Sequence, residues 1–307
     1  MSKVRIAISV GDLNGVGIEI AIKAHEEVSK LCAPLYCINS YMLNQASTLL
    51  NYKIPSNFEI SEVGGEFAVK KGCVDKDSGR YSYDSFIHAI SLCEQKKADA
   101  VVTMPIHKEA WMLAGLKYKG HTDLLREHFK RDAIMMLGCQ KMFVALFSEH
   151  IPLKDVASSI KYKKLKQFFL DFNNSVPNER VAVLGLNPHA GDNGVLGNEE
   201  LIITKAIKSA NKKVCFEQFI GPLVPDIAFT PHIREKFKYF IAMYHDQGLA
   251  PLKALYFDES INVSLNLPII RTSVDHGTAF DIAYEKKAKT LSYINAIKSA
   301  IALGERL

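Results

Sequence analysis

The sequence predicts an α/β protein, built as an α/β/α sandwich of two subdomains. β-rich runs alternate with helical patterns along the chain, which is typical of this class. The length of 307 residues suits two domains of about 150 residues each. The composition, 48% hydrophobic and 23% charged, is that of a globular protein and excludes disordered and low-complexity classes.

The alternation of strand and helix begins at the first residues. Residues 4–10 are β-rich, Gly11–Gly17 form a glycine-containing loop, and 18–30 have a helical pattern. The same order of strand and helix recurs at 34–39 and 42–51, at 98–103 and 108–114, and at 180–185 and 197–210, with a further strand at 239–243. Strands that alternate with helices in this way predict a largely parallel sheet.

Two further elements follow from local patterns. The apolar runs 133–137 and 142–148 are separated by four residues that include Gly138, which predicts an antiparallel hairpin inserted into the sheet. Near the end of the chain, apolar residues at 291, 294, 297 and 301 predict a helix over 289–303.

Charge and composition narrow the functional class. The net charge of +5 is mild, so we expect no nucleic-acid partner. The basic run Lys161–Lys166 is either the solvated face of a helix or a polyanion site. Apolar stretches are too short to span a bilayer or to form a signal peptide, which predicts a cytoplasmic protein. The six cysteines lack zinc-finger spacing and are expected to be reduced thiols.

The glycine loop after the first strand does not match a nucleotide fingerprint. Glycines stand at 11, 15 and 17, which is not the G-x-G-x-x-G spacing, and no P-loop is present. Its backbone N–H groups could bind an anion, or the loop could be a tight turn without a ligand. Both interpretations stay open from the sequence.

Three histidines directly follow β-rich runs: His150, His189 and His245. Ligands in such sheets bind beyond the carboxyl ends of the strands, so the three imidazoles are candidates for one divalent metal site. Asp192 and Asp246 could orient their rings as outer-sphere carboxylates, or could serve as helix N-caps. Any one of the histidines alone would more often be structural.

Other polar residues suit a small phosphorylated acid. Lys253 and Arg271 are cations on either side of Asn262, and Arg binds phosphate or carboxylate bidentately. His121 and Thr122 open a predicted helix, where backbone N–H groups favour phosphate oxygens. Lys253 alone could equally be a surface lysine.

Several sequence blocks together resemble the 4-hydroxythreonine-4-phosphate dehydrogenase family of pyridoxal phosphate biosynthesis. The resemblance covers nearly the whole chain. The blocks are GDLNGVGIEI (11–20), TMPIHKEAWMLAGLKYKGHTDLL (103–125), GLNPHAGDNGVLGNEE (185–200), GPLVPDIAFT (221–230), AMYHDQGLAPLK (242–253) and LPIIRTSVDHGTAFDIA (267–283). Two positions depart from the family pattern: Leu13 replaces a proline and Asn266 replaces a glycine.

The resemblance implies a fold similar to isocitrate and isopropylmalate dehydrogenases, with a cleft between the two subdomains. It implies a cofactor-binding subdomain of residues 1–120 and 262–307. Residues 121–261 would form the metal, substrate and dimerisation subdomain. The family works as a homodimer whose active site, near the dimer interface, borrows residues from the partner.

The resemblance also implies roles for individual residues. His150, His189 and His245 would hold one divalent metal: zinc, cobalt, magnesium or manganese. Substrate contacts fall on His121, Thr122, Lys253, Asn262 and Arg271. The adenosine-binding loop for NAD or NADP is assigned to His276, Gly277, Thr278 and Asp281.

The implied reaction is the oxidation and decarboxylation of 4-phosphooxy-L-threonine to 3-amino-2-oxopropyl phosphate. The catalytic base stays open among His107, Lys108 and Lys253; His107 and Lys108 could also be ordinary polar residues at a helix start. One alternative is a related dehydrogenase of threonate or erythronate 4-phosphate. Others are a metal-dependent phosphohydrolase, a phosphate-binding protein and a noncatalytic binding module.

Overall fold

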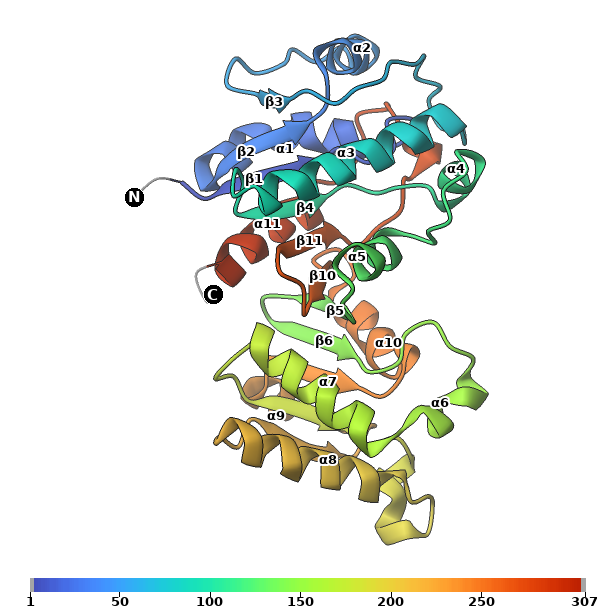
Figure 1. The fold of residues 1–307 in the computed structure, drawn as a ribbon, viewed down its shortest axis with the longest axis vertical. Helices are drawn as coiled ribbons and strands as arrows, with labels where there is room; N and C mark the ends of the chain where they lie inside the picture. The colour runs from blue at the N-terminus through green and yellow to red at the C-terminus, as the bar shows by residue number, and fades with distance from the viewer. Residues whose placement is uncertain (1–2, 305–307) are drawn as a thin grey trace. The chain divides into compact units, whose positions relative to one another are not determined.

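The computed structural model describes residues 3–304, so the two ends of the predicted cofactor-binding subdomain, 1–2 and 305–307, lie outside the described residues. The chain divides into two compact units (Figure 1). Unit 1 comprises Met1–Arg131, Ile261–Val263 and Leu267–Leu307, and unit 2 comprises Asp132–Ser260 and Ser264–Asn266. This division puts residues 121–131 with the N-terminal part of the chain, whereas the sequence prediction began the second subdomain at 121.

The strands of unit 1 occur in the order β3-β2-β1-β4-β11-β10. Parallel pairing joins β3 to β2, β2 to β1, β1 to β4 and β4 to β11. Their bounds are β1 (Arg5–Ser9), β2 (Ala33–Cys37), β3 (Glu59–Ser61), β4 (Ala100–Thr103), β10 (Ile261–Leu265) and β11 (Ile270–Val274). β1 and β4 are almost wholly buried, as expected for β-branched central strands.

The helices of unit 1 cover these strands. α3 packs against β1, β2 and β4 and crosses in front of them in Figure 1, while α1 and α11 pack against each other. The bounds are α1 (Gly17–Leu31), α2 (Ser40–Leu50), α3 (Lys76–Glu94), α4 (Lys108–Leu113), α5 (His121–Phe129), the 3₁₀ turn η2 (Phe280–Ile282) and α11 (Leu291–Gly304). Asn39 and Asp75 cap α2 and α3 by accepting hydrogen bonds from backbone N–H groups.

Unit 2 combines one antiparallel pair with parallel strands, in the order β5-β6-β9-β7-β8. β5 and β6 are antiparallel, which confirms the predicted hairpin, and the remaining neighbours are parallel. The bounds are β5 (Ile134–Cys139), β6 (Met142–Leu146), β7 (Val181–Leu184), β8 (Phe219–Leu223) and β9 (Tyr239–Ala242).

The helices of unit 2 bury an apolar core on these strands. α10 packs on β5, β6 and β9, and α7 packs on α8. The bounds are α6 (Leu153–Ser159), α7 (Tyr162–Ser175), the 3₁₀ segment η1 (Pro188–Gly194), α8 (Glu199–Val214), α9 (Pro231–Lys236) and α10 (His245–Tyr256). Lys163 and Lys164 of the basic run are exposed on α7 while Leu165 is buried, which confirms the solvated helix face.

The α/β class predicted from the sequence is therefore confirmed. All six cysteines are free thiols, of which Cys73 and Cys215 are exposed. Within residues 3–304, no helix has both the length and the apolar character needed to cross a bilayer.

Candidate active site

Arg271 is a buried cation on β11 of unit 1. Only 2% of the residue is exposed, and its Nη2 donates to the Thr103 hydroxyl over 2.7 Å. Its Nη1 donates to Asn262 Oδ1 over 3.4 Å. Burial lowers the pKa of Arg271 to about 9, because the charged guanidinium is withdrawn from water. An anion bound here would stabilise the guanidinium charge, since Arg pairs strongly with phosphate and carboxylate.

His121 stands beside this cation at the first residue of α5. Its pKa lies well below the ordinary value, first because the ring is buried and second because the Arg271 charge opposes protonation. The ring contacts Phe86 and Trp111 edge-on, with centroids 4.6 and 5.8 Å away. Its Nε2 is buried with no hydrogen-bond partner within residues 3–304. A neutral imidazole with an unpaired nitrogen can contact a bound oxygen.

The structure thus brings together His121, Asn262 and Arg271 of the predicted substrate contacts. Thr122 follows His121 in the first turn of α5. Lys253 belongs to unit 2, where its Nζ lies 5.3 Å from the centroid of the Phe257 ring. Thr103, which the sequence analysis missed, closes β4 and holds the guanidinium; only its place at a strand end could have drawn attention to it.

The glycine loop after β1 is a tight turn. Asp12 N donates to Pro105 O, Asn14 N to Asp12 Oδ1 and Gly15 N to Asp12 O. Val16 N donates to Thr278 O, so the backbone amides of four loop residues have acceptors within the protein. These hydrogen bonds favour a tight turn without a ligand over a loop that binds an anion.

The predicted cofactor loop packs against this turn. A side chain at Gly15 would come within 2.7 Å of Thr278 O, so only glycine permits the approach. Thr278 is buried, whereas His276, Gly277 and Asp281 are exposed, and a Cβ at Gly277 would meet open space. The exposed residues leave room for a ligand on this rim.

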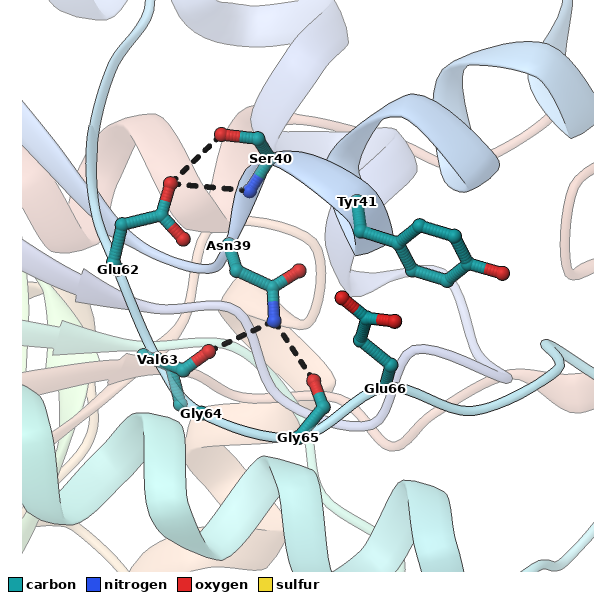
Figure 2. A pocket seen from close by; sticks show the side chains of 8 residues that line it. All are labelled: Asn39, Ser40, Tyr41, Glu62, Val63, Gly64, Gly65 and Glu66. Carbon is teal, nitrogen blue, oxygen red and sulfur yellow. Dashed lines mark hydrogen bonds between the residues drawn. The ribbon is translucent and has the colours of Figure 1, made fainter.

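His107 and Lys108 differ in their surroundings. The His107 ring stacks on Phe280 of the cofactor loop, with centroids 4.9 Å apart and planes 13° apart. Lys108 is exposed at the first residue of α4, as the interpretation of a polar helix start expects. A separate hollow of unit 1, about 470 Å³ in volume, is lined by Asn39–Tyr41 and Glu62–Glu66 (Figure 2). No predicted site residue lines it.

In unit 2, the three predicted metal-binding histidines follow three adjacent parallel strands, β6, β9 and β7. Hydrogen bonds join the loops that carry them. Both the backbone N–H and the hydroxyl of Ser148 donate to Met243 O. Gln247 accepts from Met243 N and donates to Gly185 O, which links the loops after β9 and β7.

His150 and His245 lie together, with ring centroids 5.7 Å apart. Two imidazoles on one tetrahedral ion, with nitrogens about 2.1 Å from it, have centroids about 5 Å apart, so this pair suits a shared divalent ion. Asp246 Oδ1 lies 3.1 Å from His245 Nδ1, which leaves Nε2 of that ring for a ligand. Of the two roles open for Asp246, ring orientation matches this contact.

His189 is not in that pair. It is exposed and begins six consecutive residues with positive φ, His189–Gly194, in a left-handed turn inside η1. Within the described part of the chain, no group of three or more histidine, cysteine or acidic side chains is placed to hold a metal. Two of the three predicted ligands therefore come together, and the third lies on a loop tied to theirs.

Glu200 anchors the loop of His189 and was not identified from the sequence. Its Oε1 accepts from the N–H groups of Leu186 and Asn187, and its Oε2 accepts from the Asn187 side chain. A side chain at Gly191 would come within 2.6 Å of the same carboxylate. The paired acids at the start of α8 were the visible signal, but nothing in their spacing indicated a buried role.

Comparisons with known proteins agree with this architecture. The family model described as "Pyridoxal phosphate biosynthetic protein PdxA" matches residues 30–300. A Campylobacter fetus protein named 4-hydroxythreonine-4-phosphate dehydrogenase is 58% identical over 304 residues, covering 99% of each chain.

Solved structures of other proteins share this fold. A 4-hydroxythreonine-4-phosphate dehydrogenase from Klebsiella pneumoniae superposes with a TM-score of 0.85 at 31% identity, covering 99% of this chain and 100% of that one. A beta-decarboxylating dehydrogenase from Thermococcus kodakarensis shares the fold alone, with a TM-score of 0.51 at 14% identity over 98% of this chain and 82% of that one. With the family match over most of its length, the chain belongs to the PdxA family of pyridoxal phosphate biosynthetic proteins.

Proposed function

We propose that this protein is an NAD(P)- and divalent-metal-dependent dehydrogenase. It oxidises and decarboxylates 4-phosphooxy-L-threonine to 3-amino-2-oxopropyl phosphate in pyridoxal phosphate biosynthesis. The names of its relatives support the substrate. The observation in the structure that carries the proposal is the buried guanidinium of Arg271 beside the neutral ring of His121.

Substrate binding is assigned to residues that favour an anion. Arg271 supplies a fixed charge whose hydrogen bonds to Thr103 and Asn262 restrict its orientation. His121 and Thr122 add contacts at the start of α5. Lys253, in unit 2, keeps its proposed role as a cation that contacts the substrate.

The metal is assigned to His150, His245 and His189. The His150–His245 spacing and the Asp246 contact support two of these ligands, and Gln247 ties the loop of the third to that of His245. Imidazole ligands favour zinc or cobalt, while oxygen atoms of a substrate would admit magnesium or manganese. A divalent ion held there supplies Lewis-acid polarisation of a substrate oxygen.

The nicotinamide cofactor is assigned to the rim formed by His276, Gly277, Thr278 and Asp281. Its exposed polar groups and the open space at Gly277 support this placement. The tight turn after β1 takes no part in phosphate binding, which agrees with the absence of a Rossmann fingerprint. The cofactor supplies the hydride acceptor, and the chain must supply a group that takes the proton of the substrate hydroxyl.

We also propose a cytoplasmic homodimer. Val195, Leu196 and Leu201, close in sequence to the His189 loop, are exposed apolar side chains, with 78% of Val195 and 68% of Leu201 accessible. Such a group is typical of a protein interface. A dimer formed there would place the partner near His189, and light scattering of the purified protein measures the mass directly.

The proposed function is tested by NADH formation from 4-phosphooxy-L-threonine after chelation and metal replacement. We expect no turnover in the chelated protein and recovery with zinc, cobalt or magnesium. Arg271→Ala should lose turnover, while Arg234→Ala, which removes an arginine that bonds Tyr256 and Phe229 O, should keep it. No turnover with any metal contradicts the assigned substrate, and threonate 4-phosphate then tests the sugar-acid alternative.

A further inference from the structure

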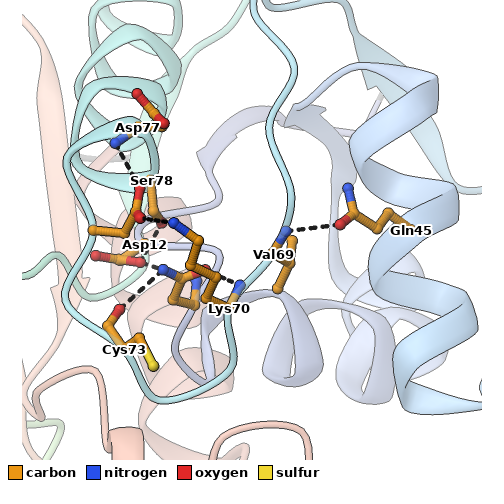
Figure 3. A network of polar contacts seen from close by, with 9 residues as sticks. Asp12, Gln45, Val69, Lys70, Cys73, Asp77 and Ser78 are labelled. Carbon is orange, nitrogen blue, oxygen red and sulfur yellow. Dashed lines mark hydrogen bonds and ion pairs between the residues drawn. The ribbon is translucent and has the colours of Figure 1, made fainter.

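Asp12, in the tight turn after β1, is a fully buried carboxylic acid. Its Oδ1 accepts hydrogen bonds from the Ser78 hydroxyl and from Asn14 N (Figure 3). Its Oδ2 is also buried but has no hydrogen-bond partner among residues 3–304. A buried carboxylate oxygen without a partner is costly, so a role beyond closing the turn is expected.

His107 is the basic group whose positive charge favours the ionised form of this carboxyl. Its Nδ1 is buried without a hydrogen-bond partner in the described chain, so no hydrogen bond joins it to Asp12 Oδ2. A backbone hydrogen bond of 2.9 Å from Asp12 N to Pro105 O holds the loops of Asp12 and His107 together. A side chain at Gly11 would come within 2.3 Å of the same oxygen, so the backbones are in close contact.

The His107 ring is also fixed on its other side. It lies flat on Phe280, which belongs to the proposed cofactor loop. Thr103, which holds Arg271, ends β4 four residues before His107. The imidazole is therefore placed on the segment that links the proposed anion site with the proposed cofactor rim.

The other groups around Asp12 do not supply the positive charge that His107 supplies. The negative charge of Asp75 raises the pKa of Asp12, and Asp75 is itself paired with Lys70 over 2.5 Å. The Tyr284 hydroxyl, whose own pKa burial raises, donates to Leu13 O. Burial is the largest influence on Asp12 and raises its pKa, while Ser78, Asn14 and the His107 charge oppose that rise.

We propose that Asp12 is a positioning residue that acts through His107, and that His107 is the base of the proposed dehydrogenase. The imidazole accepts the proton of the substrate hydroxyl as the O–H bond breaks. A nicotinamide cofactor bound at the proposed rim would accept the hydride, with its electron pair, from the carbon that bears the hydroxyl, and the C–O bond of that carbon would become C=O. The Asp12 carboxylate stabilises the resulting imidazolium without taking up the proton. The inference rests on the proposed function.

The kinetic test compares Asp12→Asn with Ser78→Ala. The asparagine keeps an oxygen for Ser78 and Asn14 but removes the charge, whereas Ser78→Ala removes a hydrogen bond and keeps the charge. We expect Asp12→Asn to lower kcat about 10- to 100-fold with little change in KM, and to displace the pH profile of kcat. Ser78→Ala should keep the wild-type pH profile. Equal losses in both variants, or an unchanged profile in Asp12→Asn, would overturn the proposal.

A second measurement needs no turnover and therefore separates this inference from the proposed function. The Asp12 carboxyl is followed by carbon NMR in protein labelled at aspartate, in the wild type, in His107→Gln and in His88→Gln. His88 bonds Ser61 and is not among the groups that act on Asp12, so it is the matched control. We expect the pKa of Asp12 to rise further in His107→Gln alone. An Asp12 titration that is the same in all three proteins contradicts the pair, even if Asp12→Asn fails to fold.

Discussion

The Thr103 hydroxyl accepts a hydrogen bond of 2.7 Å from Arg271 Nη2. Thr103 is the last residue of β4 and pairs in register with Ser273 of β11, two residues beyond Arg271. Neither Thr103 nor Arg271 is more than 2% exposed. The register of two parallel strands thus fixes a buried cation, because it places a hydroxyl beside the guanidinium.

Thr103→Val should weaken substrate binding. The valine keeps the shape of the threonine but removes an acceptor from a charged donor, an interaction worth about 1.5–3 kcal/mol. The substrate would recover part of that loss, so we expect KM for the phosphorylated substrate to rise about 10-fold with a smaller change in kcat. Steady-state kinetics at saturating cofactor measures both constants.

Thr272→Val is the control for this substitution. Thr272 is equally buried on β11, but its hydroxyl donates to Ala296 O rather than touching Arg271. We expect it to lower the melting temperature without raising KM. If the two valine variants change KM alike, the Thr103–Arg271 bond is not what positions the guanidinium.

Asp246→Asn should weaken metal binding. The Asp246 carboxylate faces His245 Nδ1 at 3.1 Å, and carboxylates in this position commonly contribute 10- to 100-fold to metal affinity. Because 84% of the Asp246 side chain is exposed, we expect the lower end, about 10-fold. Competition for zinc with a coloured chelator measures the change.

Asp192→Asn is the matched variant on the neighbouring loop. Asp192 lies in the left-handed turn and does not cap α8, whose N-cap is Asn198. Zinc affinity should stay at the wild-type level there. Equal weakening by both substitutions would indicate a general effect of surface charge instead of ring orientation by Asp246.

Gly191→Ala should disturb the turn that carries His189. Gly191 has φ +79°, and an added Cβ would meet the buried Glu200 carboxylate at 2.6 Å. We expect a lower melting temperature together with weaker zinc binding, because Glu200 holds Leu186 and Asn187 in place. Thermal unfolding and the same zinc competition report the two effects.

Gly194→Ala separates backbone strain from the clash. Gly194 has φ +97°, so alanine is strained there too, but its Cβ would meet only the Asn198 side chain, at 3.0 Å. It should destabilise the protein while leaving zinc affinity nearly unchanged. Loss of zinc in both variants would mean that any strain in this turn, not contact with Glu200, moves His189.

The sequence predicted the elements whose apolar pattern is strong. The alternation of strands and helices and the hairpin of β5 and β6 were recognisable because buried β-branched runs are continuous. α3 was missed. Its inner face carries Ser78, Gly79, Ser82 and Ser85, all buried, so its apolar periodicity is weak. Gly79 lets α3 approach the backbone of Ala110, a contact that no pattern in the chain predicts.

The site was predicted unevenly for a similar reason. Charged and imidazole side chains are visible in a sequence. The three histidines were found because they follow β-rich runs, His121 because it opens a predicted helix, and Arg271 because it is a cation suited to an anionic ligand. Their partners, Thr103, Gln247 and Glu200, act through contacts with residues distant in the chain. The left-handed turn at His189 was also hidden, because four of its six residues are not glycine and gave no signal of positive φ.

Asp12 and Asp75 should have opposite effects on the pH dependence of stability. Burial raises the pKa of Asp12 in the folded protein, so the folded state holds its proton more tightly than the unfolded state, whose value is about 3.9. Stability from this group is lost as pH rises through the folded pKa. Asp12→Asn should therefore gain stability relative to the wild type as pH rises above about 4.

Asp75 is the internal control, because the hydrogen bond from Lys70 lowers its pKa. Its contribution is present above the unfolded value and is lost as pH falls through the folded value, so Asp75→Asn should lose stability relative to the wild type as pH rises. Urea unfolding of the three proteins from pH 2 to pH 8 gives both differences, because the Asp75 contribution changes below about pH 3.9 and the Asp12 contribution above it. Parallel curves of unfolding free energy against pH for Asp12→Asn and the wild type would show that the buried carboxyl is ionised at no cost. If the environments of Asp12 and Asp75 are as described, the stability differences of the two variants from the wild type change with pH in opposite directions.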